Sequence, residues 1–173
     1  ISLPINLRAF FDSETMANFF AVTLIEYLPD CENCTFEDVL KTVCREMEEK
    51  ITKEKLEETI SYNVSNEKKW YLRIAPLFVK WGALNVIFRR NDRAYTMTLS
   101  NIGPVDIEEG YREEIEQFHL MIGVSKRQPM KCAVCAYKEQ VIVTFTSVFD
   151  DTRLQDRFFG FLRKNGIPVE LES

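Results

Sequence analysis

Hydrophobic and polar residues alternate in short runs near the start of the chain and over much of its second half, a pattern typical of β-strands. Residues 3–9 (LPINLRA) have the pattern of a short strand, and Asn18 to Leu28 is rich in aromatic and β-branched residues, which predicts a longer one. Later strands are predicted over Ala94 to Asn101, Ile115 to Val124, Lys131 to Tyr137 and, with the strongest signal, Gln140 to Phe149. Lys138-Glu139 reads as a tight turn, and residues 102–111 as turn and irregular chain.

The middle of the chain has the periodicity of helices. Thr35 to Asp38 has the form of a capping box, and the apolar residues that follow fall on one helical face: Val39, Leu40, Val43, Met47 and Ile51. This helix is expected to continue, whole or broken, to about Ser61, and a connection is expected over Asn63 to Asn66. Trp70 to Arg89 predicts a second helical stretch that Pro76 starts, kinks or breaks. We expect it to face the core, the alternative being an amphipathic surface helix.

A last helix is predicted over Thr152 to Lys164, capped by Asp150 or Asp151 and ended by Asn165-Gly166. Its buried face is expected to hold Phe158, Phe159 and Leu162. Together these patterns predict one mixed α/β domain over residues 1–173, with no internal repeat and no low-complexity linker.

Composition narrows the function classes. The 173 residues are 46% hydrophobic and carry a net charge of −5, which excludes wholesale disorder and argues against nucleic acid as a partner. Ile1 to Pro4 shows no signal-peptide pattern, and a start inside a strand-like run favours an excised domain. No uninterrupted apolar run has the length of a membrane span. The odd number of cysteines, five, favours free thiols in a reducing cytoplasm.

Two Cys-x-x-Cys pairs, Cys31/Cys34 and Cys132/Cys135, raise the possibility of a four-thiolate zinc site or a redox pair. The first pair falls in a predicted loop between Asp30 and Cys34. The second falls in a predicted strand, where residues three apart point to opposite faces, which opposes chelation by both. We therefore expect no metal site, and we interpret these cysteines as small, semi-buried apolar residues.

The chain has a single histidine, His119, in the strand-like run around Phe118. A general base needs an orienting partner and a reacting proton within reach, and no nucleophile or second histidine stands near it in sequence. We interpret His119 as a structural or surface residue. The motifs G-x-S-x-G, G-x-G-x-x-G, H-E-x-x-H and the Walker loop are all absent from the sequence.

Two short segments carry more information. The first is Thr98 to Gly103 (TLSNIG), where Asn and Gly tolerate the backbone of a hairpin or bulge, and where a small hydroxyl could also donate to a developing oxyanion. The second is Pro4 to Arg8 (PINLR), whose arginine is flanked by apolar residues. Such an arginine is often half-buried and paired, because burying its charge alone is costly.

With the strand and helix that end the chain, these segments resemble the superfamily of CoA-dependent acyltransferases. This superfamily includes chloramphenicol acetyltransferase, dihydrolipoyl acyltransferase cores, peptide-synthetase condensation domains and bacterial alcohol acetyltransferases. PINLR and TLSNIG look most like the C-terminal half of the condensation-like alcohol acetyltransferases. The run from Tyr95 to Asn165 is similar in order to the end of the dihydrolipoyl acyltransferase core. The resemblance implies a two-layer α+β sandwich, with a mixed sheet and helices packed on one face.

The resemblance also implies a reaction. In this superfamily the first histidine of an H-x-x-x-D motif takes the proton from an acceptor hydroxyl or thiol as that group attacks an acyl thioester. The present sequence has no H-x-x-x-D, and where the dihydrolipoyl acyltransferase core has its catalytic DHRxxDG turn it has Phe149-Asp150-Asp151-Thr152-Arg153-Leu154. The missing histidine fits the non-catalytic copy of a duplicated fold.

Four residues are then assigned roles by resemblance. Ser100 matches a serine that can stabilise the tetrahedral oxyanion, Asn101 and Gly103 shape its loop, and Arg8 matches an arginine that pairs with the aspartate of H-x-x-x-D. The expected protein is a cytoplasmic O-acyltransferase that moves an acetyl or acyl group from CoA to a small alcohol. It would have no tightly bound cofactor, and its base would lie in an N-terminal half.

Two alternatives stay open. The first is a non-catalytic docking or partner-binding module of the same fold. The second is self-association through the apolar face that a detached half-domain should expose.

Overall fold

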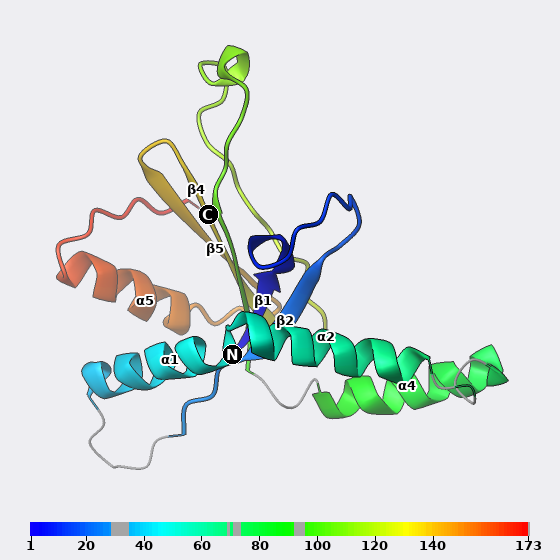
Figure 1. Ribbon diagram of the computed structural model, residues 1–173. Helices are drawn as coiled ribbons and strands as arrows, with labels where there is room; N and C mark the ends of the chain where they lie inside the picture. Colours follow the sequence, from blue (N-terminus) through cyan, green and yellow to red (C-terminus); the bar gives the residue numbers. More distant parts are fainter. Residues whose placement is uncertain (29–34, 69, 71–73, 92–95, 173) are drawn as a thin grey trace. The chain divides into compact units, whose positions relative to one another are not determined.

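A computed structural model describes residues 1–28, 35–68, 70, 74–91 and 96–172 of the chain (Figure 1). In chain order its elements are β1 (Ser2–Asn6), the 3-10 turn η1 (Leu7–Ala9), β2 (Phe20–Leu24), α1 (Phe36–Lys50), α2 (Lys53–Glu67), α4 (Leu77–Asn91), β3 (Thr98–Pro104), the 3-10 turn η2 (Glu109–Tyr111), β4 (Met130–Tyr137), β5 (Gln140–Ser147) and α5 (Arg153–Lys164).

The strands form a mixed five-stranded sheet in the order β2-β1-β3-β4-β5. β1 pairs antiparallel with β2 and parallel with β3, and β4 pairs antiparallel with β5. The predicted α/β class, a mixed sheet with helices, is therefore confirmed. The chain divides into two compact units, Ile1–Asn101 and Ile102–Ser173, and β3 contains the boundary between them.

The first unit is built on the β1–β2 pair, whose register runs from Ser2 opposite Leu24 to Asn6 opposite Phe20. Its small core consists of Leu7, Ala21 and Leu56, with Ile5, Phe10, Phe11, Phe19 and Ile60 packed against it. Residues 7–9 form a 3-10 turn rather than the end of the first strand, because the Asn6 side chain accepts a hydrogen bond from the Arg8 N–H and turns the chain. The second strand is shorter than predicted, and it ends at Leu24.

The capping box is confirmed at the start of α1. Thr35 Oγ1 accepts from the Asp38 N–H (3.3 Å), and Asp38 accepts from the Thr35 N–H (3.0 Å). A break lies at Ile51 and Thr52, after which α2 begins. The connection predicted over Asn63 to Asn66 is wrong, because α2 continues to Glu67.

Helix α4 begins directly after Pro76, which confirms that this proline starts a helix. The Pro76 carbonyl accepts from the N–H groups of Val79 and Lys80. The expectation that this stretch faces the core is wrong for α4, whose large apolar side chains, such as Leu77 (81%) and Trp81 (70%), are exposed. Its apolar residues recur on several sides, so periodicity alone cannot distinguish a buried helix from a surface one.

In the second unit the β4–β5 hairpin and the turn at Lys138-Glu139 match the prediction, with Lys138 at a φ of 53°. β5 ends at Ser147. On α5, Phe158 and Phe159 meet Phe145 edge to face, although Phe158 stays 37% exposed and the predicted buried face is only partly covered. The helix ends as predicted at Asn165-Gly166, where Ile167 N–H bonds to the Leu162 carbonyl in a Schellman motif.

Two boundaries in this half differ from the prediction. β3 runs on to Pro104, so residues 102–104 are strand rather than irregular chain. The strand predicted over Ile115 to Val124 is absent from these described residues. Side chains of the β4–β5 hairpin donate hydrogen bonds to backbone carbonyls of this segment instead. Thr146 Oγ1 donates to Ile122 O (2.7 Å), Lys138 Nζ to Ile115 O (2.9 Å) and Cys135 Sγ to Phe118 O (3.2 Å).

Candidate functional site

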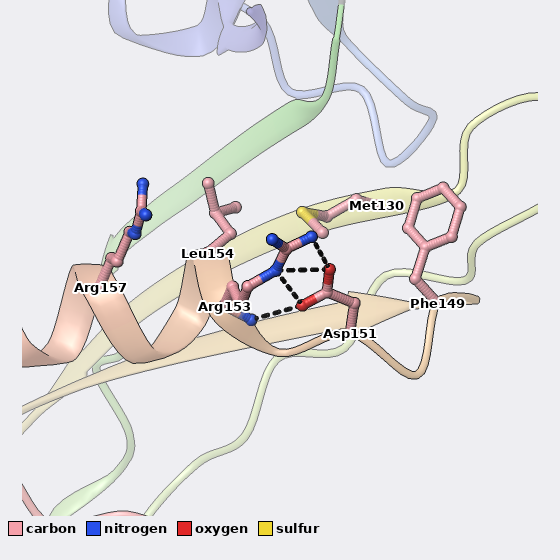
Figure 2. A pocket seen from close by; sticks show the side chains of 6 residues that line it. All are labelled: Met130, Phe149, Asp151, Arg153, Leu154 and Arg157. Atoms are coloured by element: carbon pink, nitrogen blue, oxygen red, sulfur yellow. Dashed lines mark hydrogen bonds and ion pairs between the residues drawn. The ribbon is translucent and has the colours of Figure 1, made fainter.

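The turn after Phe149, where the resemblance places a catalytic turn in other proteins, borders a hollow of about 470 Å³. It is lined by Met130, Phe149, Asp151, Arg153, Leu154 and Arg157, all in the second unit (Figure 2). Met130 opens β4, Phe149 and Asp151 lie in the turn after β5, and the other three lie on the first turns of α5. The hairpin and the helix thus create the hollow where they approach each other.

One ion pair dominates the hollow. Arg153 Nη2 lies 2.6 Å from Asp151 Oδ2, and Arg153 Nε donates to Oδ2 (2.8 Å) and Oδ1 (3.0 Å) (Figure 2). The backbone N–H of Arg153 also donates to Asp151 Oδ1 (3.0 Å). The predicted N-cap at Asp150 or Asp151 is wrong, because the N-cap is Thr152, although the Asp151 carboxylate accepts from the N–H of Arg153, the first helical residue.

These bonds set the charge state of the carboxyl. Hydrogen bonds from the Arg153 guanidinium, and then from its backbone N–H, lower the pKa of Asp151 below its ordinary value. The same pair raises the pKa of Arg153. At neutral pH both groups are charged, so Asp151 is a poor proton donor and a weak base.

Arg157 lies one helical turn after Arg153, so both cationic side chains belong to the same side of α5. Among the described residues no carboxylate forms an ion pair with Arg157, whereas Arg153 is neutralised by Asp151. Met130, Phe149 and Leu154 supply an apolar wall beside them, with Phe149 55% exposed. Such a hollow suits a ligand that joins an anionic group to an apolar portion.

The lining lacks the usual groups for proton transfer. The six lining residues include no histidine, cysteine, serine or lysine, and their one carboxyl is held in an ion pair. The hollow can bind and orient a ligand, but it holds no general base.

The residues singled out in TLSNIG lie in β3. Ser100 is half-buried, and it lies within the strand rather than at its end. Asn101 is exposed, and Gly103 has a φ of +73°, which L-residues rarely adopt. The predicted left-handed position is therefore Gly103, whereas Asn101 keeps a negative φ.

Arg8 lies in η1 and is exposed rather than half-buried. Its Nη2 donates to the carbonyls of Thr15 (2.7 Å) and Ala17 (2.8 Å). It thereby closes the loop between η1 and β2, a local contact that sequence did not predict.

His119 lies close to Glu172, which belongs to the segment that follows α5. With its proton on Nδ1, its Nε2 accepts from the Gln117 amide (2.8 Å), and Glu172 Oε2 lies 3.8 Å away. The side chain is 39% exposed. This arrangement agrees with a structural or surface histidine.

Cys132 and Cys135 are free and buried in β4, and burial raises the pKa of the Cys132 thiol to about 11. No cluster of metal-ligating side chains occurs among the described residues. Cys31 and Cys34 lie outside the described residues, so their interpretation as small, semi-buried apolar residues stays a prediction. A protonated, buried thiol at Cys132 fits the interpretation as a small apolar residue.

The missing histidine after Phe149 is evident from the sequence, whereas the arginine pair was not predicted. Its signal is nevertheless present there, because Arg153 and Arg157 stand four residues apart directly after an acidic turn.

No protein-family model matches the chain, and no curated protein or solved structure matches it either. Among the described residues no helix is long and apolar enough to cross a bilayer.

Proposed function

We propose that this chain is the C-terminal half of a CoA-dependent O-acyltransferase, whose catalytic histidine lies in an N-terminal half. The observation that carries the proposal is the order of elements from TLSNIG onward: β3, which contains TLSNIG, then the β4–β5 hairpin, then α5. The dihydrolipoyl acyltransferase core that the sequence resembles ends in a similar order, a strand with SNLG, then further strands and a last helix. It has one strand more than this chain, whose residues 115–124 form no strand. The turn before α5 holds an ion pair in place of a histidine, which suits a supporting half.

The proposed reaction moves an acetyl or related acyl group from CoA to a small alcohol. The alcohol oxygen attacks the thioester carbonyl while the histidine of the other half removes its proton. The carbonyl oxygen becomes an oxyanion, to which the Ser100 hydroxyl donates a hydrogen bond. The intermediate then collapses, the carbon–sulfur bond breaks, and the CoA thiolate leaves with the proton from the histidine. No tightly bound cofactor is required.

In this proposal the N-terminal half is the main partner, and the protein acts in the cytoplasm. Gly103 and Asn101 shape the strand that presents Ser100. Arg8 fixes the loop before β2, and in the proposed protein it pairs with the aspartate of H-x-x-x-D in the N-terminal half.

The test compares the purified chain with the whole protein that the parent gene encodes. Transfer of labelled acetyl from acetyl-CoA to a panel of small alcohols should be found with the whole protein and not with the chain alone. Transfer by the chain alone would contradict the half-enzyme proposal. Inactivity of both, with no H-x-x-x-D about one domain length upstream, would favour the docking module instead.

A further inference from the structure

Helix α4 exposes an unusual amount of apolar surface. Leu77, Trp81 and Leu84 follow each other at intervals of four and three residues, so they share one helical face, and they are 81%, 70% and 49% exposed. Phe78 (75%) and Ile87 (52%) extend this surface around the helix. Solvent-exposed patches of this kind mark surfaces that are covered when the protein works.

The charged residues of this segment of the sequence are all of one sign. Six of the chain's 22 basic residues and none of its 27 acidic residues lie between Lys68 and Asn91. The rest of the chain therefore has 16 basic residues against 27 acidic ones. A basic segment in an otherwise acidic protein is suited to an anionic surface.

Both tryptophans of the chain also lie here. Trp70, just before the helix, is 72% exposed, and Trp81 is 70% exposed. Tryptophan is enriched at membrane–water interfaces, where its ring enters the headgroup region while its N–H keeps a polar partner.

Length excludes a membrane span. Helix α4 has 15 residues, which at 1.5 Å per residue is about 22 Å, shorter than the ~30 Å of a bilayer core. A helix such as α4, which carries apolar and basic residues but is too short to span the bilayer, can instead lie along the membrane–water interface.

We propose that α4 docks this protein on an anionic lipid surface, with the face of Leu77, Trp81 and Leu84 at the boundary between headgroups and acyl chains. Lys80 stands beside this face, so phosphate groups can meet positive charge next to the apolar side chains. A second copy of the chain is a poorer occupant, because symmetric pairing would bring two basic helices together. The proposal does not rest on the acyltransferase activity.

The experiment mixes the chain with vesicles of phosphatidylcholine alone or with 30% phosphatidylserine, and it follows flotation together with tryptophan emission. Trp70 and Trp81 are the only tryptophans, so their emission reports on this segment directly. The chain should float with the anionic vesicles, with a blue shift of the emission. Raising NaCl from 0.1 to 0.5 M should weaken binding several-fold, roughly as screening requires.

Matched pairs of substitutions identify the surface. Leu77→Asp with Leu84→Asp should lower the partition coefficient by about tenfold or more, since two buried apolar contacts are replaced by like-charge repulsion. The control is Met121→Asp with Leu171→Asp, which adds the same charge at apolar residues of the other unit that are 70% and 54% exposed. This pair should change the partition coefficient less than about twofold. Circular dichroism checks that both pairs fold.

Three results would overturn the proposal. The first is equal binding to neutral and anionic vesicles, and the second is an equal loss in both pairs of variants. The third is the absence of vesicle binding, with a concentration-dependent oligomer that Leu77→Asp with Leu84→Asp dissolves, which would assign the helix to protein association instead.

Discussion

Asp151 has two roles at once in the hollow after Phe149. Its carboxylate accepts from the first N–H of α5 and from the Arg153 guanidinium, so one side chain both starts a helix and neutralises a cation. Arg157 is left as the cation that a ligand can meet. Whether Arg153 can also bind a ligand therefore depends on the stability of its ion pair with Asp151.

Replacing Arg153 tests this account of the ion pair. In Arg153→Gln the pKa of Asp151 should rise toward its ordinary value, because the guanidinium is the largest cause of its lowering. A carbon-detected NMR titration of the side-chain carboxyl measures it. Arg163→Gln, which removes a bond to the Val169 carbonyl at the other end of α5, should leave the titration unchanged. Equal titration curves in wild type and Arg153→Gln would contradict the account.

The buried Cys132 thiol predicts a pH dependence of stability. Its pKa of about 11 lies above that of an unfolded thiol, about 8.5, so the unfolded state loses this proton first as the pH rises. The stabilisation is complete below about pH 8 and declines up to about pH 11, by roughly 3 kcal/mol.

Urea unfolding of wild type and Cys132→Ala at several pH values measures this effect, since other groups titrate alike in both proteins. The difference between their free energies of unfolding should shrink above about pH 8.5. A constant difference from pH 7 to pH 10.5 would show that the pKa of the Cys132 thiol is not raised in the folded protein.

Some of these residue-scale features could be predicted. The Thr35 capping box is a local pattern, so sequence suffices. The bonds from Arg8 to Thr15 and Ala17 could not be foreseen, because they depend on the path of a loop that no periodicity encodes.

At the scale of elements, α5 is ended by backbone conformation. Gly166 has a φ of +81° at the Schellman position, whereas Gly160 lies inside the helix with open space around it. Position 166 therefore favours glycine because of its positive φ, whereas position 160 can accept a side chain.

Alanine substitutions should separate them. Gly166→Ala should lower the free energy of unfolding by about 1 kcal/mol, because a side chain at positive φ is strained. Gly160→Ala should raise it by up to about 1 kcal/mol, because alanine is the better helix former. Changes of the same sign in urea unfolding would contradict this end of α5.

The segment at 115–124 is held by side chains rather than by a ladder, and Thr146 carries the shortest of these bonds. Thr146→Val should destabilise the protein by about 1–2 kcal/mol, since it leaves the Ile122 carbonyl unsatisfied. Thr144→Val, on the same face of β5, is the control and should cost less. Equal losses in urea unfolding would show that the bond is unimportant.

The same segment explains where prediction of elements fails. The β4–β5 hairpin was predicted because its alternation and its turn are local. The run at 115–124 has strand-like composition, yet whether it joins the sheet depends on partners far along the chain, here Cys135, Lys138 and Thr146. Exposure of α4 was missed for a related reason, because it depends on what the rest of the fold leaves uncovered.

At the scale of the whole molecule, the proposal makes this chain a supporting half. Its fold class follows from the sequence, but the division at Asn101 and Ile102 does not, since it falls inside a strand and no linker composition marks it. Ser100 lies in that strand. The hollow after Phe149, with its Asp151–Arg153 ion pair, provides binding chemistry without a general base.

The turnover number of the whole protein that the parent gene encodes, measured with Ser100→Ala, tests this account most directly. An oxyanion donor predicts that kcat falls roughly ten- to a thousandfold, with the thermal unfolding temperature unchanged. Ser61→Ala, an exposed serine of α2, should leave kcat as it is. An unchanged kcat in Ser100→Ala would reduce Ser100 to a strand residue and contradict the proposed role of this half.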